Sequence, residues 1–260
     1  MKFENTEVWG FEHALRGMRN PMNSWDKSDS SYCITSIDES TGHCGTCPVS
    51  EGCTGSQVDI ETRYIIGKND MRLAQKLIKA GTGHRKFMRQ IFVSVDVTAP
   101  LYLWKEFDQY KIGVTTNSCS TMHKLATTPI TLDCFETDDC DSLSSDKFSI
   151  QLPLVDKEEY YGYGIGNYIT FLEGLRQYYI KTKDKKYWKE LVRWLPESWL
   201  QKRTITMSYE NVYAIVHQRR NHKLNEWSGQ DNPALPNFIS WAKTLPYADK
   251  LIFIDINVGE

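Results

Sequence analysis

The sequence lacks the features of a membrane protein and of a general nucleic-acid binder. No stretch approaches about eighteen consecutive apolar residues, the length with which a helix can cross a bilayer. The formal net charge is only −2, which argues against a surface coated in basic residues for nonspecific nucleic-acid binding. Residues 1–18 lack the apolar core of a signal peptide, so we expect a cytoplasmic protein without membrane contact.

Internal repeats and low-complexity segments are also missing. Hydrophobic residues make up 40% and charged residues 25%, the composition of an ordinary globular protein. We therefore predict a single α+β domain over residues 1–260. Periodicity and capping residues predict helices over 69–80, 99–113, 156–181, 186–195, 209–222 and 237–244, and strands over 90–97, 203–207 and 251–256.

A Cys-rich insertion, residues 32–60, interrupts this pattern. Its spacing is C-x10-C-x2-C-x5-C, formed by Cys33, Cys44, Cys47 and Cys53. Thiolates at C-x2-C spacing can hold a tetrahedral zinc ion, and an iron–sulfur cluster uses the same ligands. The odd total of seven cysteines fits free thiols or metal ligands better than a disulfide framework. Zinc, an iron–sulfur cluster and a loop of free thiols therefore all remain open.

Two groups of basic residues could bind an anion. One lies within two turns of the predicted helix over 209–222, and the other directly precedes the strand over 90–97. They comprise His217, Arg219, Arg220 and His222, and His84, Arg85, Lys86 and Arg89. A planar guanidinium suits a phosphate or a pyrimidine carbonyl. The alternatives are a basic helix end that complements the macrodipole, and a solvated turn.

A small polar segment, VTTNSCSTMHK over residues 114–124, follows the helix predicted from residue 99. We predict that it forms a binding loop beside that helix. Cys119 precedes His123 by four residues, and an imidazole can stabilise a nucleophilic thiolate. The alternative is a polar turn with a buried cysteine.

The order of these motifs resembles the flavin-dependent thymidylate synthases of the ThyX type, over about residues 69–227. In that family a helix leads into a loop with a histidine, then a strand, then an Ala-Pro helix start. His84 and Ala99-Pro100 match this order, and Arg89-Gln90 stands where the family has a Glu-His pair. The segment NSCSTMH is also similar to one found in a group of phage-associated proteins.

The central motif of the family is kept only in part. Its Arg-His-Arg corresponds to Gln109-Tyr110-Lys111, and its Asn-Glu-x-Ser-x-Arg-Tyr corresponds to residues 117–123, where a serine replaces the glutamate. The final block, a Leu-Pro, a strand and a helix with an arginine, matches in order and spacing. The resemblance implies a substrate site formed by Arg219, Arg220, Lys111, Asn117 and Ser120, and a flavin near His84, Arg89 and Gln90.

The resemblance further implies a mixed sheet, a homotetramer and FAD at the subunit interfaces. The substrate would be dUMP, and methylenetetrahydrofolate and NADPH would be the one-carbon donor and the reductant. The one-carbon unit would reach C5 of the pyrimidine as a methyl or hydroxymethyl group, without a protein nucleophile.

Two other functions remain open. The absence of each family cation would cost a charge-assisted hydrogen bond to flavin or nucleotide, worth roughly 1.5–3 kcal/mol. Their loss suggests a protein that kept the scaffold and binds a nucleotide or nucleic acid without catalysis. A Cys119-dependent transferase is the third hypothesis.

Overall fold

The computed structural model describes residues 1–32, 64–138 and 165–254. Four strands form its main sheet in the order β1-β4-β6-β5, and each neighbouring pair is antiparallel. The strands are β1 (Lys2–Trp9), β4 (Phe92–Pro100), β5 (Val114–Ser118) and β6 (Leu200–Ser208). The mixed sheet that we expected is therefore wrong for the described strands. The reason is that β6 inserts between β4 and β5, which run parallel to each other without being neighbours.

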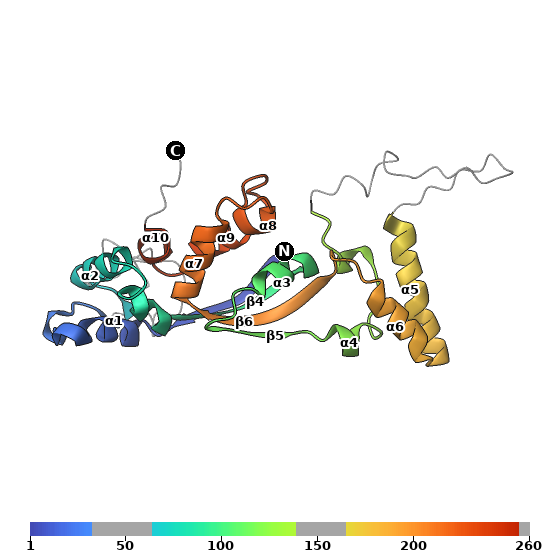
Figure 1. The fold of residues 1–260 in the computed structure, drawn as a ribbon, viewed down its shortest axis with the longest axis horizontal. Helices are drawn as coiled ribbons and strands as arrows, with labels where there is room; N and C mark the ends of the chain where they lie inside the picture. The colour runs from blue at the N-terminus through green and yellow to red at the C-terminus, as the bar shows by residue number, and fades with distance from the viewer. Residues whose placement is uncertain (33–63, 139–164, 255–260) are drawn as a thin grey trace, which may run out of the picture.

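Helices cover one side of this sheet and extend beyond it at both ends along the long axis of the molecule (Figure 1). The α-helices are α1 (Phe11–Arg19), α2 (Lys68–Lys79), α3 (Leu101–Phe107), α4 (Thr121–Lys124), α5 (Ile165–Thr182), α6 (Lys185–Arg193), α7 (Tyr209–Arg219), α8 (Asn225–Ser228), α9 (Phe238–Lys243) and α10 (Ala248–Leu251). Short 3-10 helices are η1 (Asn20–Met22), η2 (Trp25–Lys27), η5 (Arg85–Gln90) and η6 (Leu132–Cys134). Within the described ranges, no helix has both the length and the apolar character needed to cross a membrane.

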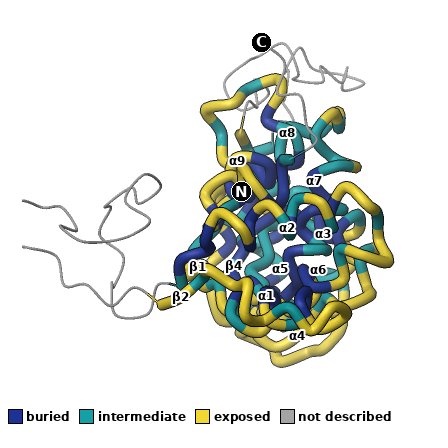
Figure 2. The backbone as a smooth tube through the Cα atoms, turned by 90° about the vertical axis from the view of Figure 1, so that its left-hand side faces the viewer, coloured by how far each residue is buried: buried dark blue, intermediate teal, exposed yellow. Residues whose placement is uncertain are grey.

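The two faces of the sheet differ in chemistry. Alternate residues of β4 and β6, among them Val93, Val95 and Ile205, are buried in one core with residues of α3, α7 and α9. These helices lie on the same side of the sheet in Figure 1. Figure 2 shows the buried residues gathered in the interior and the exposed residues along the outer turns. The apolar face of the sheet thus fixes where α3 and α7 lie.

The opposite face of the sheet is polar. Directly opposed residues on antiparallel strands share a face, so Asn117, Thr204 and Asp96 form one row across β5, β6 and β4. Thr204 Oγ1 donates to Asp96 Oδ1 at 2.6 Å. Hydrogen bonds from Thr204, Asn5 and Lys202 lower the pKa of Asp96 to about 2. This row is an ordered polar surface on the side away from α7.

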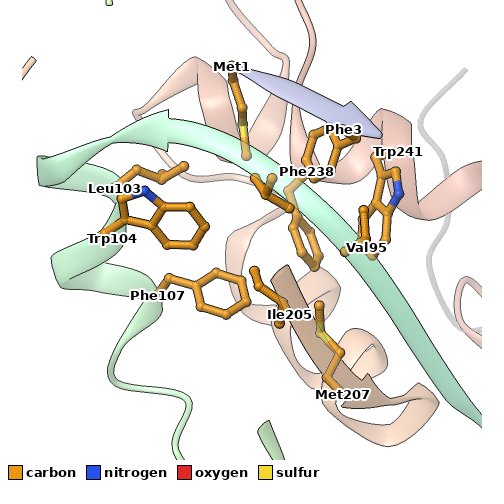
Figure 3. Close-up of a pocket in the computed structure, with 11 residues that line it drawn as sticks. Met1, Phe3, Val95, Leu103, Trp104, Phe107, Ile205, Met207, Phe238 and Trp241 are labelled. Atoms are coloured by element: carbon orange, nitrogen blue, oxygen red, sulfur yellow. The ribbon is translucent and has the colours of Figure 1, made fainter. Parts of the chain in front are cut away.

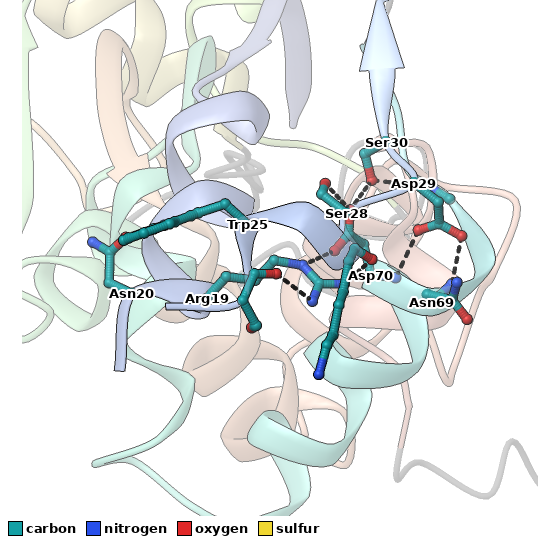
Figure 4. A network of polar contacts seen from close by, with 11 residues as sticks. Arg19, Asn20, Trp25, Ser28, Asp29, Ser30, Asn69 and Asp70 are labelled. Atoms are coloured by element: carbon teal, nitrogen blue, oxygen red, sulfur yellow. Dashed lines mark hydrogen bonds and ion pairs between the residues drawn. The ribbon is translucent and has the colours of Figure 1, made fainter. Parts of the chain in front are cut away.

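A buried ion pair anchors the end of the molecule that contains α1 and α2 (Figure 4). Arg19 Nε donates to Asp70 Oδ1 at 2.6 Å, and the hydroxyl groups of Ser28 and Ser30 donate to Oδ2. Burial acts to raise the pKa of Asp70, but these three hydrogen-bond donors outweigh it and lower the pKa. The network fixes the turn after α1 against the start of α2.

A second hydrophobic cluster lies at the other end, where α5 packs against α6 (Figure 1). Its buried members are Leu125, Ile130, Phe135, Leu172 and Leu191. Glu173 binds Arg176 with both carboxylate oxygens, and that hydrogen bonding lowers the pKa of Glu173 to about 2. The expected helices over 156–181 and 186–195 correspond to α5 and α6 where the structure describes them.

A two-stranded ladder joins the described residues on either side of residues 33–63. Strands β2 (Ser31–Tyr32) and β3 (Tyr64–Ile65) are antiparallel, and the rings of Tyr32 and Tyr64 meet edge to face at 5.1 Å. Tyr247 Oη donates to the carbonyl oxygen of Tyr64 and accepts from the backbone N–H of Ile66. Residues 33–63, with all four predicted metal ligands, lie outside the described ranges.

Two predicted segments have a different structure from the one expected. The predicted binding loop over 114–124 begins as β5, because Val114 and Thr116 alternate with polar residues and pair with β6. The strand expected over 251–256 is wrong at its described residues. There α10 and the following turn bury Leu251, Ile252 and Phe253 against the core.

Candidate functional site

Helix α7 positions most of the predicted ligand-binding residues. It begins directly after β6 with a capping box, in which Ser208 and Asn211 satisfy each other's backbone N–H groups. Tyr209, Val212 and Val216 are buried against the sheet, so both ends of the helix are fixed relative to the core. Glu210 and Arg219 are nine residues apart, which places the two ends about 14 Å from each other.

The start of α7 meets η5 in an ion-pair cluster. Arg85 Nε lies 3.4 Å from Glu210 Oε1, and Arg89 pairs with both oxygens of the same carboxylate. The hydrogen bond to Glu210 raises the pKa of Arg89. The Arg85 guanidinium also stacks on Tyr213, 4.5 Å from the ring centroid, and the Tyr213 and His217 ring centroids are 4.0 Å apart. We call Arg85, Arg89, Glu210 and Tyr213 the η5–α7 cluster.

This cluster has more positive than negative charge. Two guanidinium groups share the one carboxylate of Glu210, and the neighbouring His84 and Lys86 are exposed. Arg89 is 56% exposed, whereas Glu210 is only 13% exposed. The excess of positive charge at this helix start favours an anionic ligand there.

The end of α7 is organised around a different carboxylate. Glu106 Oε2 accepts from Arg219 Nη1 and from the buried indole of Trp227, each at 2.9 Å, and lies 3.4 Å from His222 Nε2. Arg219 Nε donates to Tyr110 Oη at 2.8 Å, and its guanidinium also lies over the Trp227 ring. We call Glu106, Tyr110, Arg219 and Trp227, with His222, the Glu106 cluster. It joins α3 to the turn after α7.

The two arginines predicted to bind the substrate lie on different sides of α7. Successive helical residues are rotated by about 100°, so Arg219 lies opposite Glu210, whereas Arg220 shares the side of Tyr213 and His217. Arg219 is 15% exposed and engaged in the Glu106 cluster. The guanidinium of Arg220 forms no hydrogen bond or ion pair with another described residue. Of the pair, only Arg220 has a guanidinium without a partner in the described chain.

The other predicted substrate residues have no side-chain contact with either cluster among the hydrogen bonds and ion pairs of the described chain. Asn117 is exposed on the polar face of β5, on the side of the sheet opposite α7. Ser120 caps α4, where its hydroxyl accepts from the backbone N–H of His123 at 3.1 Å. Lys111 is exposed in the turn before β5. No hydrogen bond or ion pair between described residues joins any of these three to Arg219 or Arg220.

The predicted flavin residues are close in sequence but differ in surroundings. His84 is exposed directly before η5, and Arg89 belongs to the η5–α7 cluster. Gln90 lies beside α1, where a Cβ added to Gly17 would come within 2.6 Å of Gln90 Oε1. Cations for a pyrophosphate are therefore present at η5, and the residues there fit the anionic part of FAD.

An apolar cavity lies between the sheet and α3 and α9 (Figure 3). Its lining includes Val95, Phe107, Ile205 and Phe238, and its volume is about 10 Å³, enough for about one water molecule. The indole nitrogens of Trp104 and Trp241 in its wall already donate to Gln201 and Thr6. Without a free polar group in this wall, the cavity does not suit a nucleotide.

Sequence reasoning missed Glu106, Glu210 and Tyr213. The spacing of Glu210, Tyr213, His217 and Arg220 places them along one side of a helix, and that signal could have been found. The partnership of Glu106 with Arg219 joins residues 113 positions apart, which no local pattern indicates. Among the described residues, no group of three or more His, Cys, Asp or Glu side chains could hold a metal ion.

Comparison with known proteins gives structural likeness without sequence likeness. No protein-family model matches the chain, and no curated protein matches it. Two solved structures of the flavin-dependent thymidylate synthase ThyX from Helicobacter pylori, both with FAD and dUMP, are similar to it. One has a TM-score of 0.57 at 13% identity and covers 98% of this chain and 99% of its own. The other has a TM-score of 0.58 at 14% identity and covers 98% of each chain. The chain thus has a ThyX-like fold over nearly its whole length.

Proposed function

We propose that this protein is a ThyX-like flavoenzyme that transfers a one-carbon unit to C5 of a pyrimidine nucleotide such as dUMP. The observation that carries the proposal is the likeness over 98% of the chain to structures that contain FAD and dUMP. In this proposal methylenetetrahydrofolate is the one-carbon donor and NADPH the reductant. Bound FAD would supply the redox chemistry between them.

The η5–α7 cluster supports this function because it provides cations at a fixed place. Arg85 and Arg89 would bind phosphate oxygens, and His84 and Gln90 would lie beside the cofactor. Arg220 would reach the nucleotide from the same side of α7. Arg219 would act as a positioning residue, because its guanidinium is held by Glu106 and Tyr110.

Lys111 follows Tyr110 in a turn that contacts α7 of the same chain, whereas Asn117 and Ser120 complete the proposed substrate site only if several copies of the chain assemble. Asn117 lies on the polar sheet face and α7 lies on the other, so the two cannot line one cavity within a single chain. We propose a homotetramer in which the polar face of one copy meets the η5–α7 cluster of another. Such a shared site would bring the predicted residues together without changing the fold.

A visible spectrum tests the proposed function. Purified protein reconstituted with FAD should retain a flavin band at about 450 nm after gel filtration. The variant Arg89→Gln should retain less flavin, while Lys105→Gln, which removes an exposed lysine of α3, should match the wild type. A colourless wild-type protein after incubation with FAD would contradict the proposal.

One observation favours a second function, nucleotide binding without flavin chemistry. Tyr110 occupies a position within the family's Arg-His-Arg, and here its hydroxyl holds Arg219 and Gln218. That position is thus used for structure rather than for a ligand. Thermal-shift titrations with dUMP, dCMP, FAD and a short DNA strand separate the two functions, because stabilisation by nucleotide or DNA but not by FAD would favour binding alone.

The cysteine spacing supports a separate proposal, a zinc site formed by Cys33, Cys44, Cys47 and Cys53. Metal analysis of the purified protein should then find about one zinc ion per chain. The double variant Cys44→Ser/Cys47→Ser should lose it. Iron instead of zinc would indicate a cluster, and absence of both would indicate free thiols.

A further inference from the structure

We propose that Glu210 is an internal counterion that sets the minimum charge of the ligand at the η5–α7 cluster. A phosphate monoester, with two negative charges, would displace the Glu210 carboxylate from Arg85 and Arg89, whereas a singly charged ligand would not. The inference rests on the proposed function in one respect, since it takes the ligand to be a nucleotide. It adds a charge requirement and assigns that requirement to one residue.

The geometry shows that Glu210 fills the place of an anionic ligand. Both of its carboxylate oxygens are bound by guanidinium nitrogens, and among the described residues Arg85 and Arg89 are its only side-chain partners. This fork arrangement is the one that a phosphate would adopt with two arginines. Glu210 therefore has to move before a phosphate can take up the same contacts.

Displacement of Glu210 requires one arginine that is held in place and one that can move, and the cluster provides both. Arg85 is held on the Tyr213 ring and also donates to Thr82 Oγ1 at 3.2 Å. Arg89 is largely exposed, so its side chain can follow a ligand at little cost. Glu210 lies in the first turn of α7, where it can rotate toward solvent while the helix stays in place.

The balance of charge gives the selectivity. Exchange of the carboxylate for another single charge leaves the pairing of the two guanidiniums unchanged, so a monoanion gains nothing from their field. A dianion brings one additional charge and gains a Coulombic interaction with the second guanidinium. The partial positive charge at the α7 N-terminus adds to the same preference. The wild-type cluster should therefore bind groups with two negative charges, such as a phosphate monoester or a pyrophosphate, and exclude phosphodiesters with a single charge.

The variant Glu210→Gln tests this by titration calorimetry with dUMP and with its phosphate methyl ester, a monoanion. At low salt and about pH 8 the monoester is a dianion. We expect wild type to bind dUMP and to show no measurable binding of the methyl ester. In Glu210→Gln, dUMP should bind about three- to tenfold tighter, and the methyl ester should become measurable. Glu197→Gln, which removes an equal charge at a surface pair with Lys105, should behave as wild type.

Equal dUMP affinity in wild type and Glu210→Gln would overturn the inference while leaving the proposed function standing. Absence of dUMP binding in both proteins would instead contradict the proposed function, and inorganic phosphate then replaces dUMP as the probe. Tighter phosphate binding by Glu210→Gln would still support the counterion role, and unchanged binding would overturn it. If the glutamine variant folds poorly, Glu210→Asp, which shortens the reach of the carboxylate, should show the same direction of change.

Discussion

The two ends of α7 use the same residue types for different purposes. At its start one carboxylate, Glu210, is shared by two guanidiniums, one of which is mostly exposed. At its end one carboxylate, Glu106, is shared by a guanidinium, a fully buried indole and a histidine. The first arrangement leaves positive charge at the surface, whereas the second satisfies buried donors.

The comparison shows that an arginine in a predicted site has to be judged by its partners. Arg219 has the expected position in the sequence pattern, yet Glu106, Tyr110 and Trp227 occupy its guanidinium. Arg85 and Arg89 share a partner that a phosphate can replace. We therefore expect changes at the end of α7 to affect stability, and changes at its start to affect ligand affinity.

The largest expected effect is that of Glu106→Ala on stability. Removal of this carboxylate leaves the buried Trp227 N–H and the Arg219 guanidinium without their acceptor, which should cost about 2–4 kcal/mol. Urea denaturation followed by tryptophan fluorescence measures the loss. Glu210→Ala is the matched comparison and should cost less than about 1 kcal/mol, because Arg89 stays solvated. Equal losses of stability in Glu106→Ala and Glu210→Ala would show that the two ends of α7 do not differ in this respect.

Arg89→Gln and Arg219→Gln should separate affinity from stability. Loss of the Arg89 guanidinium should weaken dUMP binding about tenfold, or about 1.4 kcal/mol, with little change in melting temperature. Arg219→Gln should lower the melting temperature through the Glu106 cluster. Calorimetric titration measures the dUMP affinity of each variant, and thermal melts measure its melting temperature. A stability loss confined to Arg89→Gln would reverse our assignment.

Tyr110→Phe should have a smaller effect, a loss of about 1 kcal/mol of stability. The hydroxyl accepts from Arg219 Nε and donates to Gln218 Oε1, so its removal breaks two hydrogen bonds near the surface. A double-mutant cycle with Arg219→Gln should show a coupling of about 0.5–1 kcal/mol. Additive effects would mean that the Tyr110 hydroxyl does not hold Arg219.

Added salt should have the smallest and most selective effect. Between about 50 mM and 500 mM salt, dUMP affinity should fall severalfold, because the exposed guanidinium of Arg89 is screened. The stability difference between wild type and Glu106→Ala should change little, since that pair is mostly shielded from solvent. Titrations and denaturation curves at both salt concentrations check this. An affinity that does not depend on salt would argue against ligand binding at η5.

Much of the fold could be predicted because its signals are local. The apolar stripe of α2 and the glycine after it, Gly81, predicted the helix within one residue at each end, and alternation predicted β4. Strand β5 was missed because only Val114 and Thr116 face the core, and a short edge strand resembles a loop in sequence. The sequence pattern places the adjacent Arg219 and Arg220 in one substrate site. The rotation of about 100° between successive helical residues puts their side chains on different sides of α7.

The arrangement of the candidate site could not be predicted in the same way. The partners of Arg85 and Arg219 lie 125 and 113 positions away, and only the folded sheet brings them together. The resemblance to ThyX is confirmed for the α/β fold with flanking helices but not for a mixed sheet, and the assignments of His84, Arg89 and Arg220 as ligand-binding residues stay predictions. The grouping of Asn117 with Arg219 stays a prediction that requires more than one copy of the chain, because Asn117 lies on the sheet face opposite α7.

The pairing of β2 with β3 places the two ends of the intervening sequence on neighbouring strands. Ser31 pairs with Ile65 and Tyr32 with Tyr64, so both cut points lie on neighbouring strands that a two-residue Asn-Gly turn can connect. A shortened chain with this turn in place of residues 33–63 should keep the sheet and α7 intact. Grafting other sequences onto the same stem would turn this end of the molecule into a display scaffold.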